Sequence, residues 1–182
     1  MTKAELRQHY LNKRLALSEK EVLDGNTSIT QQLKKLDYTN LKVIHLFLPI
    51  AHHKEVDLWE FVHWLWDTKS HIKTVVPKCD FKTREMKTCL LTKDTQLTNE
   101  NFGIPEPIDE IIIENHDIDL VITPLVVCDT KGHRVGYGKG FYDAFFKTCR
   151  ADVQKIGVGF FPPVESISDV HEGDVEIDKY IF

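Results

Sequence analysis

The residues best suited to chemistry in this chain lie in one glycine-rich segment, residues 132–143, which reads Gly-His-Arg-Val-Gly-Tyr-Gly-Lys-Gly-Phe-Tyr-Asp. Its glycines let backbone N–H groups approach an anion closely, because no β-carbon stands in the way. Arg134 adds a planar cation and Lys139 a mobile one, and Asp143 adds an oxygen ligand of the kind that Mg²⁺ prefers. The segment therefore predicts a cradle for nucleotide phosphates with a metal ligand beside it.

Two flanking elements must position this loop. Residues 119–127 form an apolar run that predicts a buried strand. Residues 140–149 can form a helix with Phe141, Phe145 and Phe146 on one side. The spacing of the glycines matches neither the G-x-G-x-x-G of dinucleotide-binding loops nor the G-x-x-x-x-G-K-S/T of P-loops. A surface turn without a ligand is therefore the alternative interpretation.

Three motifs carry a family resemblance. Residues 134–143, R-V-G-Y-G-K-G-F-Y-D, resemble the R-L-G-x-G-x-G-Y/F-Y-D signature of the 5-formyltetrahydrofolate cyclo-ligase family. Residues 3–7 resemble the family's K-x-x-L/I-R, and residues 101–107 resemble its G-I-x-E-P segment. The order and separation of the motifs also agree with the family, so the resemblance spans nearly the whole chain.

The resemblance implies a fold, a reaction and a set of binding residues. The implied fold is α/β, a three-layer sandwich with a mostly parallel central sheet and helices on both faces. The implied reaction is the ATP- and Mg²⁺-dependent cyclisation of 5-formyltetrahydrofolate to 5,10-methenyltetrahydrofolate, with release of ADP and phosphate. The residues implied to bind ATP are Lys3, Ala4, Glu5, Leu6, Arg7, Arg134, Val135, Gly136, Tyr137, Gly138, Lys139, Gly140, Phe141 and Tyr142. Those implied to contact the folate are Ile50, Glu55, Tyr137, Phe141 and Tyr142, and those implied to hold Mg²⁺ are Asp143 and Asp174.

The implied chemistry explains why the motifs carry cations and no enzyme nucleophile. Phosphorylation turns the formyl oxygen, a poor leaving group, into phosphate, and nitrogen-10 of the same substrate then attacks the activated carbon. Because this nucleophile is intramolecular, positioning matters most. Arg134 and Lys139 are expected to be catalytic by stabilising the transferring phosphoryl group. Two rival functions are another small-molecule ATP phosphotransferase and a non-catalytic folate or nucleotide sensor.

Composition narrows the class of protein. With 182 residues, 42% of them hydrophobic and 28% charged, the chain is expected to form one cyclo-ligase domain over residues 1–182. A net charge of −5 argues against a nucleic-acid partner, and we expect a monomer whose partner is the folate. No segment predicts a signal peptide or a membrane span. Four scattered cysteines indicate reduced, mostly buried thiols in a cytoplasmic protein.

Capping and periodicity predict the other elements. Capping boxes at residues 2–5 and 18–21 predict helices over residues 3–16 and 18–35, and apolar spacing predicts a third helix from residue 57. Further strands are expected at residues 43–48, 72–76 (ended by Pro77), 85–91, 155–161 and, at a sheet edge, in the C-terminal tail.

Some side chains keep two interpretations. Arg14 shares a helix face with Lys3 and Arg7, and a solvated cationic face is the alternative to phosphate binding. Glu106 lies between two prolines that stiffen the backbone, and the sequence does not decide its role. Asp178 is an alternative to Asp174 beside the metal.

Overall fold

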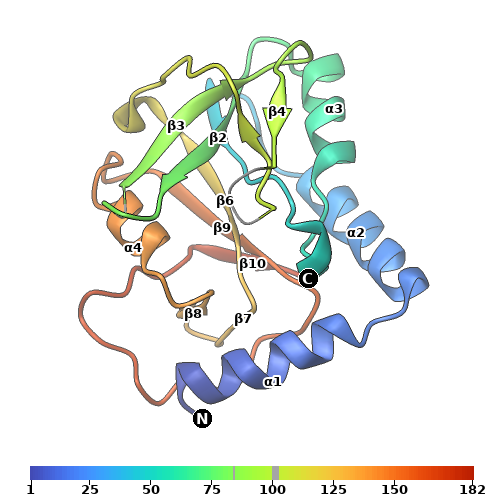
Figure 1. Cartoon of the computed structure of the whole chain (residues 1–182), viewed down its shortest axis with the longest axis vertical. Helices are drawn as coiled ribbons and strands as arrows, with labels where there is room; N and C mark the ends of the chain where they lie inside the picture. Colours follow the sequence, from blue (N-terminus) through green and yellow to red (C-terminus); the bar gives the residue numbers. More distant parts are fainter. Residues whose placement is uncertain (84, 100–102) are drawn as a thin grey trace.

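The computed structural model describes residues 1–83, 85–99 and 103–182, so Asn101 and Phe102 of the third motif lie outside the described residues. At its centre is a six-stranded sheet in the order β10-β9-β6-β1-β2-β3 (Figure 1). All neighbouring pairs in this sheet are parallel except β2 and β3. The strands of the sheet are β1 (Val43–His45), β2 (Lys73–Asp80), β3 (Glu85–Leu91), β6 (Leu120–Pro124), β9 (Gln154–Val158) and β10 (Lys179–Ile181).

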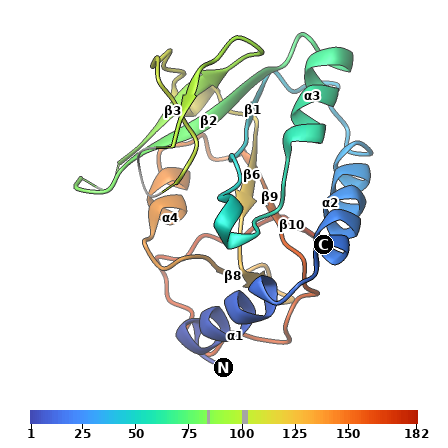
Figure 2. The same ribbon diagram turned by 45° about the vertical axis from the view of Figure 1, so that its right-hand side comes forward.

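Helices cover both faces of this sheet (Figures 1 and 2). The helices are α1 (Lys3–Leu15), α2 (Glu19–Leu33), α3 (Trp59–Thr68) and α4 (Phe141–Phe146), with 3-10 turns η1 (Ala51–His53) and η2 (Asn115–Asp117). Successive strand residues point to opposite faces. Ile44 and Ile122 belong to the cluster that includes α2 and α3. Val43 and Val121 pack instead with Phe145 of α4. The predicted α/β sandwich with a mostly parallel sheet is confirmed.

The helix α1 lies apart from these layers, below the carboxyl ends of the central strands (Figures 1 and 2). Its start is the predicted capping box, in which the Thr2 hydroxyl accepts from the Glu5 N–H and the Glu5 carboxylate accepts from the Thr2 N–H. Leu6 anchors α1 by packing against Val127 and Val135. The second predicted capping box likewise starts α2, at Ser18.

The prediction that Pro77 ends a strand is wrong, because β2 continues to Asp80. Pro77 lies opposite Thr88 of β3. The Thr88 carbonyl accepts from the Ile113 N–H on the far side of β3, so this pair exchanges no ladder hydrogen bonds. The nitrogen of Pro77 therefore faces the side of β1, which has already ended at His45. The missing N–H therefore interrupts no hydrogen bond of the ladder between β2 and β3.

The predicted strand over residues 119–127 is two strands. β6 ends at Pro124, and the chain leaves the sheet to form a small hairpin of β7 (Val127–Cys128) and β8 (Arg134–Val135). Both parts are apolar because α1 covers the hairpin, while the helices on the two faces of the sheet cover β6. The hairpin carries the glycine loop from the sheet to α4. A second small hairpin joins β4 (Leu97–Thr98) to β5 (Glu106–Pro107).

Other predicted boundaries differ by a few residues. β1 and β9 end three residues before the predicted 48 and 161, and α4 spans six residues of the predicted 140–149. The predicted edge strand of the tail is confirmed, since β10 is the terminal strand beside β9.

Candidate functional site

A cavity of about 700 Å³ lies at the carboxyl ends of β1 and β6, between α1, the glycine loop and the β2–β3 hairpin. Ligands of open α/β sheets bind beyond these strand ends. The predicted site residues that line the cavity are Lys3, Arg7, Ile50, Glu55, Arg134, Gly136, Tyr137, Gly138, Lys139, Gly140, Phe141, Tyr142, Asp143 and Asp174. The fold thus brings the N-terminal motif, the segment after β1, the glycine loop and the tail to one place.

Four of the residues predicted to bind ATP do not line this cavity: Ala4, Glu5, Leu6 and Val135. Ala4 is exposed on α1, and Glu5 closes the capping box. Leu6 and Val135 are buried in the cluster beneath α1. These residues hold the backbone that carries the cations beside them.

The glycine loop presents bare backbone to the cavity. Gly138 and Gly140 have φ values of +82° and +73°, a region that a side chain would strain. A β-carbon at Gly138 would also lie 3.1 Å from Cζ of Arg7. In the part of the chain that the structure describes, no acceptor takes the backbone N–H groups of residues 137–140. These amides remain available to an anion.

The cations around the loop come from α1, β8 and the loop itself. Arg7 Nε donates to the Gly136 carbonyl at 2.6 Å, which ties α1 to the loop. The Lys3 ammonium forms an ion pair with Asp174. Arg134 is largely buried, and its Nη2 donates to Asp143 Oδ1 at 2.6 Å while Nη1 donates to the Val175 carbonyl. Burial lowers the pKa of Arg134, and the charge of Asp143 opposes that shift.

The two carboxylates predicted to hold Mg²⁺ both face the cavity. Asp143 Oδ1 accepts from Arg134 and from the Val175 N–H at 3.1 Å, whereas its Oδ2 takes no donor among the described residues. Asp174 accepts from Lys3 and from the His171 N–H. The described residues contain no cluster of three or more His, Cys, Asp or Glu side chains suited to a metal. A free carboxylate oxygen beside a phosphate site fits Mg²⁺, which is commonly bound by one or two carboxylates together with substrate phosphates and waters.

Asp178 lies elsewhere: its Oδ2 accepts from the Lys155 N–H at 2.7 Å, and it does not line the cavity. Glu106 is buried and accepts from the Cys79 N–H at 2.8 Å, so its carboxylate joins β5 to β2. It too is absent from the cavity wall. The geometry therefore favours Asp174 over Asp178 and a structural function for Glu106.

Glu55 lies on the side of the cavity below β1, with only 6% of its surface exposed. Its Oε2 accepts from the Ile50 N–H at 2.7 Å. Its Oε1 accepts from the Tyr137 hydroxyl at 2.6 Å. Burial raises the pKa of Glu55, and the hydrogen bonds from Tyr137 and Ile50 and the charge of Arg14 partly offset that rise.

Aromatic rings form the remaining walls. Phe141 meets Phe81 edge to face, with ring centroids 5.3 Å apart. Tyr142 is more deeply placed and lies edge to face with His45 of β1 at 6.3 Å. Burial raises the pKa of Tyr142 and lowers that of His45 to about 3, so both rings are neutral at neutral pH. The walls offer flat apolar surfaces of the kind that bind heterocycles.

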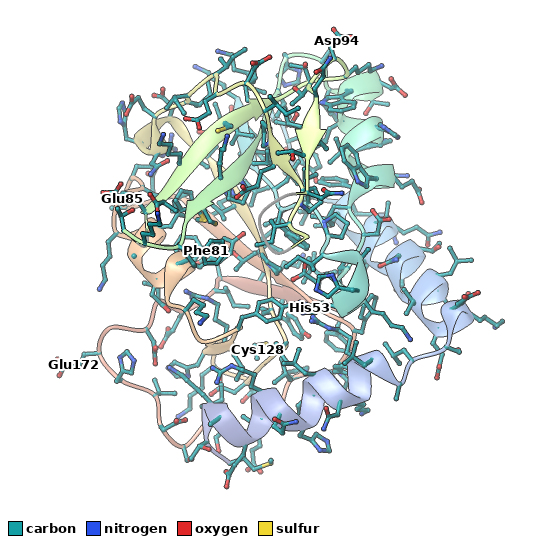
Figure 3. All side chains as sticks on the ribbon, in the orientation of Figure 1. His53, Phe81, Glu85, Asp94, Cys128 and Glu172 are labelled. Atoms are coloured by element: carbon teal, nitrogen blue, oxygen red, sulfur yellow. The ribbon has the colours of Figure 1, made fainter. Side chains whose placement is uncertain are left out.

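Several cavity residues were missed by sequence reasoning. Phe81 lies at the turn of the β2–β3 hairpin and His53 lies in η1 (Figure 3). The others are Phe47, Leu48, Pro77, Cys79, Met86, Ile104, Pro105, Pro124 and His171. The cavity residues at the ends of β1 and β6 could have been expected, because ligands of open α/β sheets bind beyond the carboxyl ends of the strands. The hairpin residues had no such signal, because β2 was expected to stop before them.

Comparison with known proteins decides the family. The family model described as the 5-formyltetrahydrofolate cyclo-ligase family matches residues 1–178. The chain belongs to the 5-formyltetrahydrofolate cyclo-ligase family. It is therefore an enzyme of that family, a ligase of folate one-carbon metabolism, and it depends on ATP as the family does.

Relatives agree over the full length. The mouse 5-formyltetrahydrofolate cyclo-ligase is 24% identical, over 99% of this chain and 91% of the relative. A solved 5,10-methenyltetrahydrofolate synthetase from Mycoplasma pneumoniae superposes with a TM-score of 0.78 at 28% identity, covering 100% of this chain and 98% of the other. That from Aquifex aeolicus gives 0.82 at 28% identity, covering 100% and 89%. In the described residues, no helix is long and apolar enough to cross a bilayer.

Proposed function

We propose that this protein catalyses the Mg²⁺- and ATP-dependent closure of 5-formyltetrahydrofolate to 5,10-methenyltetrahydrofolate, as a monomer with one site. One observation carries the proposal. The glycine-loop residues 137–140, whose amides take no acceptor among the described residues, and the buried Glu55 line the same cavity, so a nucleotide and a folate bound to them would meet inside it.

ATP would lie along the glycine loop. The N–H groups of residues 137–140 would donate to its phosphates, and Lys3, Arg7, Arg134 and Lys139 would supply the compensating charge. Lys3 and Arg134 are paired with Asp174 and Asp143. These ion pairs would hold the cations in place until the phosphates arrive. Mg²⁺, held by Asp143 and Asp174 directly or through water, would supply charge neutralisation between the phosphates.

The folate would bind on the opposite side. Glu55 would accept the paired N–H donors of the pterin ring, as a carboxylate can with two oxygens. Ile50, Tyr137, Phe141 and Tyr142 would pack against the ring system. The formyl group would then point toward the glycine loop.

The reaction follows from that arrangement. The formyl oxygen attacks the γ-phosphorus, the bond to the bridging oxygen breaks, and ADP leaves. Arg134 and Lys139 stabilise the charge on the transferring phosphoryl group. Nitrogen-10 then attacks the formyl carbon, its proton is lost, and the carbon–oxygen bond breaks to release phosphate. The cavity holds both reacting parts of one molecule together, which favours ring closure.

The test is incubation of the protein with Mg-ATP and 5-formyltetrahydrofolate while near-UV absorbance and ADP are followed together. We expect methenyl product and ADP to appear in equal amounts. ADP without methenyl product would indicate another phosphotransferase. Binding of both ligands with no ADP would indicate a sensor. Either result would overturn the proposal.

A further inference from the structure

Arg14 is a buried cation that no carboxylate of the described residues pairs with. It lies in the last turn of α1 and only 3% of its surface is exposed. Among the described residues it forms no ion pair, and its Nε has no hydrogen-bond partner. A guanidinium is seldom buried without an anion, because desolvation is unfavourable. Some function other than packing is therefore needed to explain it.

Among the described residues, the one side-chain hydrogen bond of Arg14 leads to Glu55. Arg14 Nη2 donates to the Tyr137 hydroxyl, and that hydroxyl donates to Glu55 Oε1 at 2.6 Å. A phenol has a single proton, so a donor on its oxygen fixes the direction of the second bond. The chain of donors runs from Arg14 through Tyr137 to Glu55.

Neighbouring contacts hold this chain in place. The Arg14 Cζ lies 5.5 Å from the centroid of the Tyr137 ring, and His53 stacks on that ring at 5.3 Å. Lys54 Nζ donates to the Leu15 and Leu17 carbonyls at 2.8 and 2.6 Å. The segment that carries Glu55 is thereby joined to the end of α1.

We propose that Arg14 is a positioning residue for folate binding, acting through the Tyr137 hydroxyl to fix the orientation and the ionised form of Glu55. This inference rests on the proposed function, in which Glu55 accepts the pterin donors. Arg14 therefore serves the folate and not the phosphates of ATP, although it shares a helix face with Lys3 and Arg7. With one oxygen held by Tyr137 and the other by the Ile50 N–H, the carboxylate keeps its remaining lone pairs for the ligand.

Binding measurements on single and double variants test this directly. Calorimetry would give the Kd of 5-formyltetrahydrofolate and, separately, that of a non-hydrolysable ATP analogue with Mg²⁺. We expect Arg14→Met and Tyr137→Phe each to weaken folate binding about tenfold, as loss of a hydrogen bond to a charged group does. The Kd of the nucleotide should be unchanged in Arg14→Met, and Arg14→Lys should restore part of the folate affinity.

The double variant separates this inference from a merely structural effect. If Arg14 acts through the hydroxyl, Arg14→Met in the Tyr137→Phe background should change the folate Kd by less than about twofold. Lys13→Met is the matched control, because Lys13 lies beside Arg14 on α1 but contacts the rings of Tyr10 and Phe161. Its folate Kd should match that of the wild type.

Three outcomes would overturn the inference: an unchanged folate Kd in Arg14→Met, a weakened nucleotide Kd instead, or effects that multiply in the double variant. Failure of the proposed function would give a different result. The wild-type protein would then bind the folate but form no methenyl product. Wild-type protein that fails to bind 5-formyltetrahydrofolate would overturn both.

Discussion

The two ends of the cavity are built in different ways. The loop end is one continuous stretch, residues 134–143, in which the N–H groups of residues 137–140 take no acceptor among the described residues and Arg134 is paired with Asp143. The Glu55 end is assembled from α1, the segment after β1, the glycine loop and the β2–β3 hairpin. There the carboxylate is held by neutral donors. The loop end is suited to an anion because of its backbone N–H groups. The Glu55 end is suited to a ring with N–H donors because of its packed carboxylate.

The largest expected effect comes from the loop end. Arg134→Ala should lower turnover roughly 100-fold, as loss of one preorganised donor to a developing charge does. The folate Kd should stay near the wild-type value, because Arg134 lies away from Glu55 in the hydrogen-bond network. Steady-state kinetics with calorimetry checks both. Lys20→Ala, which removes an exposed cation of α2, is the control, and unchanged turnover in Arg134→Ala would exclude Arg134 from the mechanism.

A substitution at the Glu55 end should instead weaken folate binding. Glu55→Gln keeps the size of the side chain but removes the charge, so folate affinity should fall roughly 30-fold, or about 2 kcal/mol. The Kd of the nucleotide should not change. Glu60→Gln provides the matched control, since Glu60 is exposed on α3. If Glu55→Gln weakened nucleotide and folate equally, the division of the cavity into two ends would be wrong.

A third prediction concerns His45, which is fully buried in β1 behind the ring of Tyr142. Burial lowers the pKa of His45 to about 3, below the ordinary value of about 6.5. The unfolded chain therefore binds a proton that the folded chain does not, and stability decreases as pH falls below about 6.5. Between pH 7 and about pH 5.5 this one group should lower the free energy of unfolding by about 1.3 kcal/mol.

Urea unfolding of the wild type and of His45→Leu at both pH values measures this contribution. The variant should lose less stability than the wild type on acidification, by about the amount given above. An identical pH dependence in the two proteins would show that His45 takes up its proton in the folded chain as readily as in the unfolded chain.

The smallest effect is a protection experiment. Cys79 lines the cavity, and burial raises the pKa of its thiol to about 12. Alkylation should therefore be slow at neutral pH and accelerate as pH rises toward that value. Mass spectrometry should show that 5-formyltetrahydrofolate slows labelling of Cys79 more than the nucleotide does.

Cys149, whose pKa burial raises to about 11, is partly buried outside the cavity and serves as the control. If the nucleotide protected Cys79 and the folate did not, the proposed positions of the two ligands in the cavity would be wrong.

The loop end could be predicted from the sequence because its signals are local. Glycines, Arg134, Lys139 and Asp143 are close in the chain, and the capping box at Thr2 fixes the start of α1 through neighbouring residues. The prediction for residues 119–127 failed because the hydrophobic pattern cannot tell which layer buries an apolar residue. Helix α1 covers Val127, whereas α4 covers Val121.

The Glu55 end depends on contacts between distant residues. Arg14 and Tyr137 are 123 positions apart, and Tyr137 and Glu55 are 82 apart. Phe81 reaches the cavity only because β2 continues through Pro77, which depends on where β1 stops. No spacing in the sequence carries that information. Glu55 was predicted from the family resemblance, whereas its connection to Tyr137 and Arg14 is seen only in the structure.

The most direct test of the whole account follows one oxygen atom. 5-Formyltetrahydrofolate carrying oxygen-18 in its formyl group would be converted with Mg-ATP, and the released phosphate would be examined by mass spectrometry. If the two ligands meet as the cavity suggests, the label is transferred to the phosphate, one labelled oxygen for each methenyl product formed. Methenyl product accompanied by unlabelled phosphate would contradict phosphorylation of the formyl oxygen.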